Sequence, residues 1–545
     1  MKRKIAFLFA LVVYGLFSFS YADEIYLDQL GYLPDHPKIA IVEGAPSQFK
    51  IADLKGRTVL IKEKGPTLDD RDTSKKTSKI DFSEVATPGN YYIYFGSVRR
   101  NLIIRENPYN ELLSSSWRSF YLQRCGIQIE DGKTGFKHRE CHAQDAFFLP
   151  STGKSGRKNV CGGWHDAGDY GKYVPPANYT VSTLLLCCTL NNPAETVLLK
   201  ELKHEIDWLL TMQDAKSGGV YHKATGKEFE PFILPDKDKA PRYISRISSA
   251  ATAGFAGTMA QAYPVFKKHD PQYANNLLAA ALGAWQYLEK NQELVPPSGF
   301  NNDPEIKTGI YGDNDDGDER LFAAVQLLGA TGKQKYDEYF INNYRKHNPN
   351  DTSRLGWQDF RHHAYVSYLL LPEKLTSAEV SAKVKQSFIA FAAKLAPRAE
   401  KNGFGVVLTG GDYRWGSNGL LMDYAKALIF AYLFTGEIKY KELALEQLHY
   451  ILGRNAHDLC FITGFGENTV TQLHHRPSIA SGLELPGFMA GGPNKYLQDE
   501  RTRAVFNYDT PPALVYLDDK ESYSTNENSI YWNANLVFVL GCLKL

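Results

Sequence analysis

Short runs of alternating apolar and polar residues occupy the first part of the chain, and this pattern predicts β-strands. Turn signals such as Gly44-Ala45-Pro46 and Pro88-Gly89-Asn90 separate the runs. The seven expected strands cover residues 24–27, 39–42, 48–52, 58–61, 79–82, 91–95 and 101–104. Seven short strands in such a stretch predict a small β-sandwich of the immunoglobulin type, without an intersheet disulfide because this part contains no cysteine.

Apolar residues recur at helical spacing beyond Asn107-Pro108, which has the form of an N-cap followed by proline at the first helical position. Some segments, such as 184–188 and 425–433, are apolar on most of their circumference and suit inner helices with neighbours on all sides. Consecutive helices joined by long loops suggest a double ring of six hairpins with a broad cleft at one mouth. The twelve expected helices lie near 107–123, 178–190, 196–213, 247–266, 271–290, 316–331, 333–346, 359–371, 376–395, 417–435, 437–453 and 525–541.

The start of the chain has the form of a secretory signal peptide. Lys2, Arg3 and Lys4 precede an apolar run, and small residues close the segment at Ala22. We expect residues 1–22 to be removed and the product to be secreted or periplasmic. No later segment is apolar over enough residues to cross a membrane, so we expect no membrane insertion.

Length and charge narrow the classes of protein further. A chain of 545 residues exceeds what one core usually serves, so we divide it into a sandwich at 23–105 and a helical domain at 106–545. The formal charge of +1 becomes about −2 without the leader, which gives no basis for a nucleic-acid or anionic-membrane partner. We expect a monomer. Seven cysteines cannot all pair, and their spacing is unlike a disulfide scaffold.

Two acidic sites are candidates for chemistry. Asp166 and Asp169 lie in the glycine-rich stretch 162–171, where a loop can present both carboxylates to one small target such as a water molecule. The alternative is a surface turn whose aspartates bond their own backbone. Glu527 lies at the head of a strongly apolar helix, which Ser524 or Thr525 could cap, and its alternative role is to satisfy the helix dipole in the first turn.

The long stretch 457–520 has little helical pattern and many aromatic residues, which favours a functional loop. Within it, His474 and Arg476 follow a Gly-rich aromatic turn and offer fixed donors suited to sugar hydroxyls, unless they form only a basic surface loop. Trp357, Tyr413 and Trp415 lie near expected helix ends. They could line sugar subsites, with core packing as the alternative.

Three motifs together resemble the family 9 glycoside hydrolases, the inverting cellulases with an (α/α)6 barrel, in the subgroup with an N-terminal immunoglobulin-like domain. The segment from Gly163 to Asp169 is similar to the family's Asp-Ala-Gly-Asp motif. The C-terminal signature is matched at every spaced position, and the histidine signature is matched except that Cys460 replaces Ser, Thr or Val. The C-terminal signature is matched at Tyr516, Leu517, Asp518, Tyr523, Glu527, Ser529, Asn533 and Ala534. The histidine signature is matched at Thr463, Gly466, Asn468, His474 and Arg476.

The resemblance implies a role for each acid. Asp169 would be the general base, Asp166 would help to hold the water that attacks, and Glu527 would be the general acid. His474, Arg476, Trp415 and Tyr523 would contact the substrate. We therefore expect an endo-β-1,4-glucanase that hydrolyses cellulose-like β-glucan with inversion. The alternatives are a xyloglucan-specific, mixed-linkage-specific or exo-acting enzyme, and a glycan-binding protein without activity.

Two metal sites are also expected. Cys125, Cys141, His142 and His165 offer two thiolates and two imidazoles, a set suited to tetrahedral zinc. From spacing alone, Cys161 or His138 could compete as ligands, or the cysteines could be free core residues. The resemblance implies a structural zinc on the four. It also implies calcium at Asp318 and Glu319, with Asp359 as a third ligand, where an acidic turn at 308–319 precedes a helix.

Overall fold

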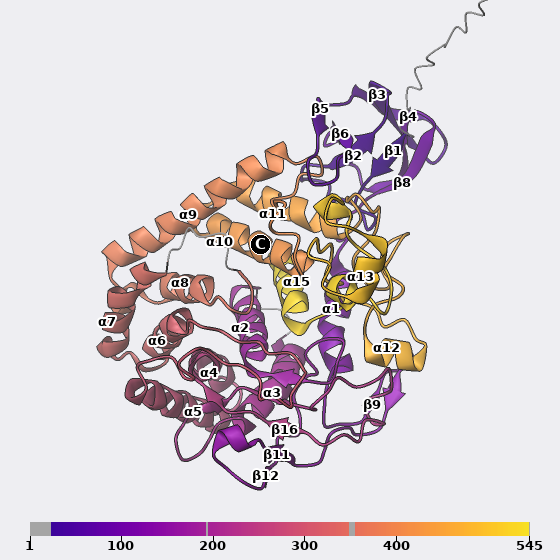
Figure 1. Cartoon of the computed structure of the whole chain (residues 1–545). Coiled ribbons are helices and arrows are strands. Elements are labelled where there is room, and N and C mark those ends of the chain that lie inside the picture. The colour runs from indigo at the N-terminus through magenta and orange to yellow at the C-terminus, as the bar shows by residue number, and fades with distance from the viewer. Residues whose placement is uncertain (1–22, 192–194, 348–354, 544–545) are drawn as a thin grey trace, which may run out of the picture.

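The computed structural model describes residues 23–191, 195–347 and 355–543. The expected signal peptide, residues 1–22, lies outside this described part. No helix within it has the length and apolarity to cross a membrane. A β-sandwich comes first in the chain and a ring of helices follows, so the predicted fold class is confirmed (Figure 1).

The sandwich consists of two antiparallel four-stranded sheets with strand orders β1-β2-β6-β5 and β4-β3-β7-β8. Its core holds inward-facing residues of both sheets, such as Ala40 and Val42 of one sheet and Phe49 and Ile93 of the other. The strands are β1 (Glu24–Tyr26), β2 (Ile39–Glu43), β3 (Gln48–Asp53), β4 (Thr58–Glu63), β5 (Thr67–Asp69), β6 (Lys76–Asp81), β7 (Gly89–Phe95) and β8 (Val98–Ile104). The sequence pattern missed β5, because Leu68 is the only apolar residue among its three.

Twelve long helices build the ring in the described part of the chain, as predicted. The inner helices are α2 (Val174–Asn191), α4 (Ser249–Lys267), α6 (Gly317–Thr331), α8 (Arg361–Leu370), α10 (Ser417–Thr435) and α15 (Ile530–Cys542). The outer helices are α1 (Asn110–Leu122), α3 (Glu195–Thr211), α5 (Pro271–Lys290), α7 (Gln334–Asn343), α9 (Ala378–Lys401) and α11 (Ile438–Ile451). The pairs form an (α/α)6 barrel, and the inner helices are buried almost all round because they carry few charged residues.

Three helix starts differ from the prediction by three residues or more. Helix α2 begins at Val174 instead of near residue 178. Helix α1 begins at Asn110 with Tyr109 as its N-cap, so Pro108 precedes the helix instead of opening it. Tyr109 is held there because its hydroxyl donates to Asp28 Oδ2 of the sandwich at 3.1 Å. The last helix begins at Ile530 rather than near residue 525.

Short elements lie mostly in the long loops of the ring. A five-stranded sheet of order β12-β11-β16-β15-β13 supports the loop that carries Asp166 and Asp169, because β13 follows that loop directly. The short strands are β9 (Ile129–Glu130), β10 (Lys137–His138), β11 (Ala146–Phe148), β12 (Arg157–Lys158), β13 (Lys172–Tyr173), β14 (Val220–Tyr221), β15 (Lys223–Thr225), β16 (Tyr243–Ile244) and β17 (Ile247–Ser248). The short helices are α12 (Arg476–Ser481), α13 (Glu500–Val505), α14 (Tyr523–Asn526) and the 3-10 turns η1 (Pro150–Thr152), η2 (Tyr344–Lys346), η3 (Glu373–Leu375) and η4 (Pro512–Leu514).

The sandwich lies against α11 and the loop after it (Figure 1). The Gln29 amide donates to the Leu452 carbonyl at 2.9 Å, and the Gln29 side-chain oxygen accepts from the amides of Glu467 and Asn468, each at 2.9 Å. His449 Nδ1 lies 2.7 Å from Asp28 Oδ2, with both side chains fully buried. The sandwich therefore fixes the start of the long stretch 457–520.

Candidate active site

The glycine-rich loop 162–171 is clamped between two distant segments by backbone hydrogen bonds. The Ile530 amide donates to the Asp166 carbonyl at 2.8 Å, and Ala167 forms a β-bridge with Ser529. On the other side, the Gly168 carbonyl accepts from the Arg476 amide at 3.1 Å. Asp166 and Asp169 are buried side chains of a fixed loop, so the alternative of a solvated surface turn is wrong.

Gly168 has no room for a side chain. A Cβ atom there would lie 2.1 Å from the His474 carbonyl oxygen, which belongs to the backbone and cannot move aside cheaply. The amide of Gly168 donates to Glu527 Oε1 at 3.2 Å. Glycine at this position therefore lets the loop and the Glu527 segment come into direct contact.

The sequence suggested that Glu527 lies in the first turn of the last helix, but it does not. It caps the end of α14 in an extended conformation, and Ser529 is the N-cap of α15. Residues 527–529 stay extended because their backbone pairs with neighbouring segments: Glu527 bridges His474, and its carbonyl accepts from the Gly491 amide at 2.8 Å. The expected capping role of Ser524 or Thr525 is therefore wrong, since both lie inside α14.

The three acids occupy different electrostatic environments. Burial raises the pKa of Glu527 well above its usual range, and the negative charges of Asp169 and Asp166 add to the effect. Burial also raises the pKa of Asp166, although the Tyr311 hydroxyl, 2.5 Å from Asp166 Oδ2, opposes the shift. Asp169 Oδ2 accepts from the Gly171 amide at 2.9 Å and from the Tyr173 hydroxyl at 3.3 Å.

A cleft of about 830 Å³ contains all three acids and the aromatic residues around them. Trp415 is 39% exposed and packs on Tyr523 with ring centroids 5.4 Å apart, while Trp357 packs on Tyr311 at 5.0 Å. Tyr413 is buried in the core and does not line the cleft, so core packing is the correct alternative for Tyr413. Such aromatic faces are suited to stacking on sugar rings.

His474 and Arg476 also line the cleft, but neighbouring carbonyls hold both side chains. His474 Nδ1 lies 2.5 Å from the Lys520 carbonyl, and burial lowers the pKa of His474 to about 4, so its ring is neutral. The Arg476 guanidinium donates to the carbonyls of Gly168 and Glu230 at 2.9 and 2.6 Å. Arg476 therefore positions the acid loop in addition to facing the cleft.

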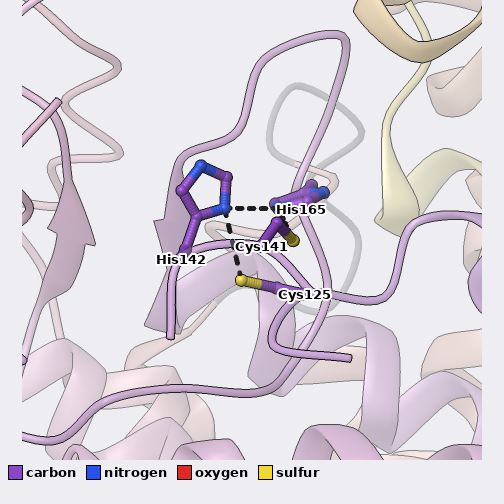
Figure 2. A group of neighbouring side chains, drawn as sticks. All are labelled: Cys125, Cys141, His142 and His165. Atoms are coloured by element: carbon purple, nitrogen blue, oxygen red, sulfur yellow. Dashed lines mark hydrogen bonds between the residues drawn. The ribbon is translucent and has the colours of Figure 1, made fainter. Parts of the chain in front are cut away.

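The four predicted zinc ligands gather at one point, as Figure 2 shows. Their donor atoms all lie within 4.8 Å of one another, while Cys161 and His138 are not part of the group. His142 Nδ1 is 3.3 Å from His165 Nε2 and 3.6 Å from Cys125 Sγ, and Cys141 Sγ is 3.9 Å from His165 Nε2.

These separations fit a tetrahedral zinc ion. Zinc–nitrogen and zinc–sulfur bonds of ordinary length place two nitrogens about 3.3 Å apart and a nitrogen and a sulfur about 3.6 Å apart. His142 Nε2 lies 3.0 Å from Asp238 Oδ2 and 2.7 Å from Arg242 Nη2. With Nδ1 on a metal, Nε2 would carry the ring proton and donate to Asp238. His165 directly precedes Asp166, which links the candidate metal centre to the acid loop.

The predicted calcium residues are brought together only in part. Asp318 and Glu319 are buried in the first turn of α6, but Asp359 forms a two-point ion pair with Arg361 at 2.8 and 2.5 Å. The group that could hold a cation here consists of Asp315, Asp318 and His347. Calcium at this turn stays a prediction, with Asp359 engaged elsewhere.

Sequence reasoning missed the tyrosines that hold the acids. Tyr173 follows the loop at β13 and Tyr311 comes from the loop before α6, and their ring centroids are 4.7 Å apart. A single tyrosine among 33 gives no local signal, and only the folded chain shows which ones reach a carboxylate.

A cleft lined by acids and aromatic residues in an (α/α)6 barrel is compatible with a glycoside hydrolase. The family model of glycosyl hydrolase family 9 matches residues 109–540, and the cellulase N-terminal ig-like domain matches residues 20–100. The chain therefore belongs to glycosyl hydrolase family 9, and the predicted family membership is confirmed.

Characterised relatives cover nearly the whole chain. It is 32% identical to a xyloglucan-specific endo-β-1,4-glucanase of Bacteroides ovatus, over 96% of this chain and 94% of the relative. It is also 32% identical to a cellodextrinase of Butyrivibrio fibrisolvens, over 95% and 99% of the two chains. Among solved structures, the zinc-binding triple mutant of the family 9 endoglucanase J30 is similar, with a TM-score of 0.89, 34% identity and coverage of 94% of this chain and 99% of that one.

Replacing Gly168 by alanine tests the close approach of the acid loop to His474. We expect Gly168→Ala to lower kcat on a soluble β-glucan by about 100-fold, because a displacement of about 1 Å is enough to spoil the alignment of catalytic groups. Steady-state kinetics and circular dichroism provide the measurement. Gly132→Ala is the control, since a Cβ there meets no atom within 4 Å. Equal kinetics for the two variants would contradict the close approach.

Proposed function

We propose that the protein is an endo-β-1,4-glucanase that hydrolyses β-glucan in one step with inversion at the anomeric carbon. The observation that carries the proposal is that Asp166, Asp169 and Glu527 line a single cleft with aromatic walls. Inversion needs a base and an acid on opposite sides of the scissile bond, with space for a water molecule. A cleft that holds two acid sites from distant parts of the chain can meet this need.

Asp169 is the general base in this proposal. Its carboxylate accepts two hydrogen bonds, from Gly171 and Tyr173, and these favour the charged form that takes a proton from water. Asp166 helps to hold that water. In support of this role, Asp166 Oδ1 is buried and has no partner among the described residues, so it can accept from a water molecule.

Glu527 is the general acid that protonates the leaving oxygen. Burial and the nearby aspartates keep it protonated above the usual pH range of a glutamic acid. As the pH rises through the pKa of Glu527, the proton is lost and activity falls. The acidic limb of the pH profile then belongs to the base, Asp169.

The substrate is a β-1,4-linked glucan. Aromatic residues of the cleft bind it by stacking, and Trp415 and Tyr523 are among them. A xyloglucan substrate is a second candidate, because the Bacteroides ovatus relative is specific for xyloglucan. We also propose that residues 1–22 direct export and that the domains divide at residue 105. The intact set of acids favours an enzyme over a glycan-binding protein without activity.

We further propose that Cys125, Cys141, His142 and His165 hold a structural zinc ion. The donor separations and the Asp238 contact support this ligand set, and the solved zinc-binding J30 mutant is a family relative. When bound, zinc would cross-link the loops that carry these four residues. It would thereby fix His165, and the acid loop that begins beside it.

Amide variants of the two main acids test their roles. We expect Asp169→Asn and Glu527→Gln each to lower kcat by about 100- to 10,000-fold, since each removes one proton-transfer group and changes little volume. Kinetics on a soluble β-glucan, with thermal melting to verify folding, give the answer. Glu521→Gln, at an exposed position on the same segment, should behave as wild type. Near-normal turnover in either acid variant would refute the assignment.

The anomeric form of the first product tests inversion. Proton NMR of a fresh cello-oligosaccharide digest should show the α-anomer accumulating before mutarotation, because a single displacement inverts the β-linkage. A panel of cellulose, xyloglucan and mixed-linkage glucan run in parallel identifies the substrate. Initial release of the β-anomer would exclude the proposed mechanism.

Metal analysis tests the zinc proposal. The purified protein should contain one zinc ion per chain, and Cys125→Ser should weaken zinc binding at least about 100-fold, because even the loss of an outer partner costs 10- to 100-fold. The thermal midpoint should fall as well. Cys161→Ser is the matched control and should keep its zinc. Loss of zinc in the Cys161 variant instead would show that the ligand set is wrong.

A further inference from the structure

Lys223 is a buried cation behind the acid loop that the mechanism above does not use. It lies on β15, directly opposite Tyr173 of β13 in the antiparallel pair, and its side chain is almost fully buried. Its Nζ donates to the Gly309 carbonyl at 2.6 Å and to Thr308 Oγ1 at 3.1 Å. No carboxylate of the described residues lies within ion-pair distance of it, so its charge is balanced only from farther away.

The loop that Lys223 holds also holds the acids. In the segment 308–311, the Gly309 amide donates to the Tyr173 hydroxyl at 3.1 Å, and that hydroxyl donates to Asp169. Two residues later, the Tyr311 hydroxyl donates to Asp166. One ammonium group therefore fixes the loop on which the hydrogen bonds of both aspartates depend.

The charge of Lys223 also acts on Asp169. The Lys223 Nζ lies 5.4 Å from the centre of the Tyr173 ring, the same residue that contacts Asp169. Burial lowers the pKa of Lys223 to about 7, and the negative charges of Asp169 and Asp303 oppose that shift. Attraction between Lys223 and Asp169 is reciprocal, so the lysine favours the ionised form of the aspartate in a region of low dielectric.

We propose that Lys223 is a positioning residue for the catalytic base: it pins the 308–311 loop and supplies the buried positive charge that keeps Asp169 ready to accept a proton. This inference rests on the proposed role of Asp169. Three carboxyl groups lie close together, and the charge of Lys223 explains why Asp169 is the base among them. The competing explanation is that Lys223 only satisfies buried carbonyl groups and has no effect on proton transfer.

Other charged and titratable groups also face Asp169, and they stay unchanged in the experiment. They are Asp166 on the same loop, Tyr173 on β13, Glu230 on the 226–240 loop, His474 beside α12, and Glu527. Lys223 is faced by Asp303 and by its neighbour His222. A shift in the titration of Asp169 caused by Lys223 alone can therefore be read against a constant background.

The test is the acidic limb of the pH profile of kcat/KM in Lys223→Met. Removing the positive charge should move this limb to higher pH by about one unit, because a nearby opposite charge stabilises a carboxylate by this order. The two pH profiles are compared below pH 7, where Lys223 of the wild-type protein is charged. Lys223→Arg should restore the wild-type limb, and Lys223→Gln, which keeps donors but lacks the charge, should shift it as methionine does.

Two controls separate charge from structural damage. Lys426→Met removes another buried lysine, one that contacts Tyr179 and Asn535 inside the barrel, and should lower the thermal midpoint without moving the acidic limb. Thr308→Val removes one acceptor of Lys223 but keeps its charge, and should also leave the limb in place. If Lys223→Met does not fold, the glutamine variant is judged by the same criterion.

The outcomes distinguish this inference from the proposed function. If Asp169→Asn is inactive while Lys223→Met and Lys223→Gln keep the wild-type limb, Lys223 is structural and the inference is overturned. If the limb shifts equally in Lys426→Met, the effect is not specific and the inference is also overturned. If Asp169→Asn stays active, the proposed role of Asp169 fails, and the inference fails with it.

Discussion

Backbone hydrogen bonds around Gly168 are the constraint on which the active cleft depends. The acid loop forms at the start of the barrel sequence and Glu527 near its end, and backbone contacts with Ser529, Ile530 and Arg476 help to hold them side by side. Main-chain bonds suit this task because they fix segments without using the side chains that must do chemistry. The missing Cβ of Gly168 makes the approach sterically possible.

Three carboxyl groups buried in one cleft repel one another when ionised, and the surrounding residues stabilise their charged forms to different extents. Glu527 and Asp166 have raised pKa values because burial outweighs their hydrogen bonds. Asp169 instead has two donors and a nearby buried lysine. In the proposed mechanism, the acid and base roles are therefore separated by environment and not by residue type, which is the usual route for enzymes that need both near neutral pH.

Much of this fold follows from sequence periodicity, since helices such as Pro271–Lys290 and Ser417–Thr435 occupy the predicted residues. Helix starts that depend on tertiary contacts could not be predicted from the periodicity. Pro108 gives a typical helix start, yet the bond from Tyr109 to Asp28 places the start later. The glycine-rich motif and the cysteine–histidine set were visible because their composition is unusual. Lys223 could not be predicted, because its role arises only from its register opposite Tyr173.

The contacts of Gln29 have a consequence for how such a protein can be rearranged during evolution. Its side chain and backbone satisfy Leu452, Glu467 and Asn468, groups that belong to the barrel's own loop. A barrel separated from its partner would expose these polar atoms together with the apolar surface around them. The β-sandwich thus forms a wall of this barrel, and a barrel without it would need other groups to satisfy Leu452, Glu467 and Asn468.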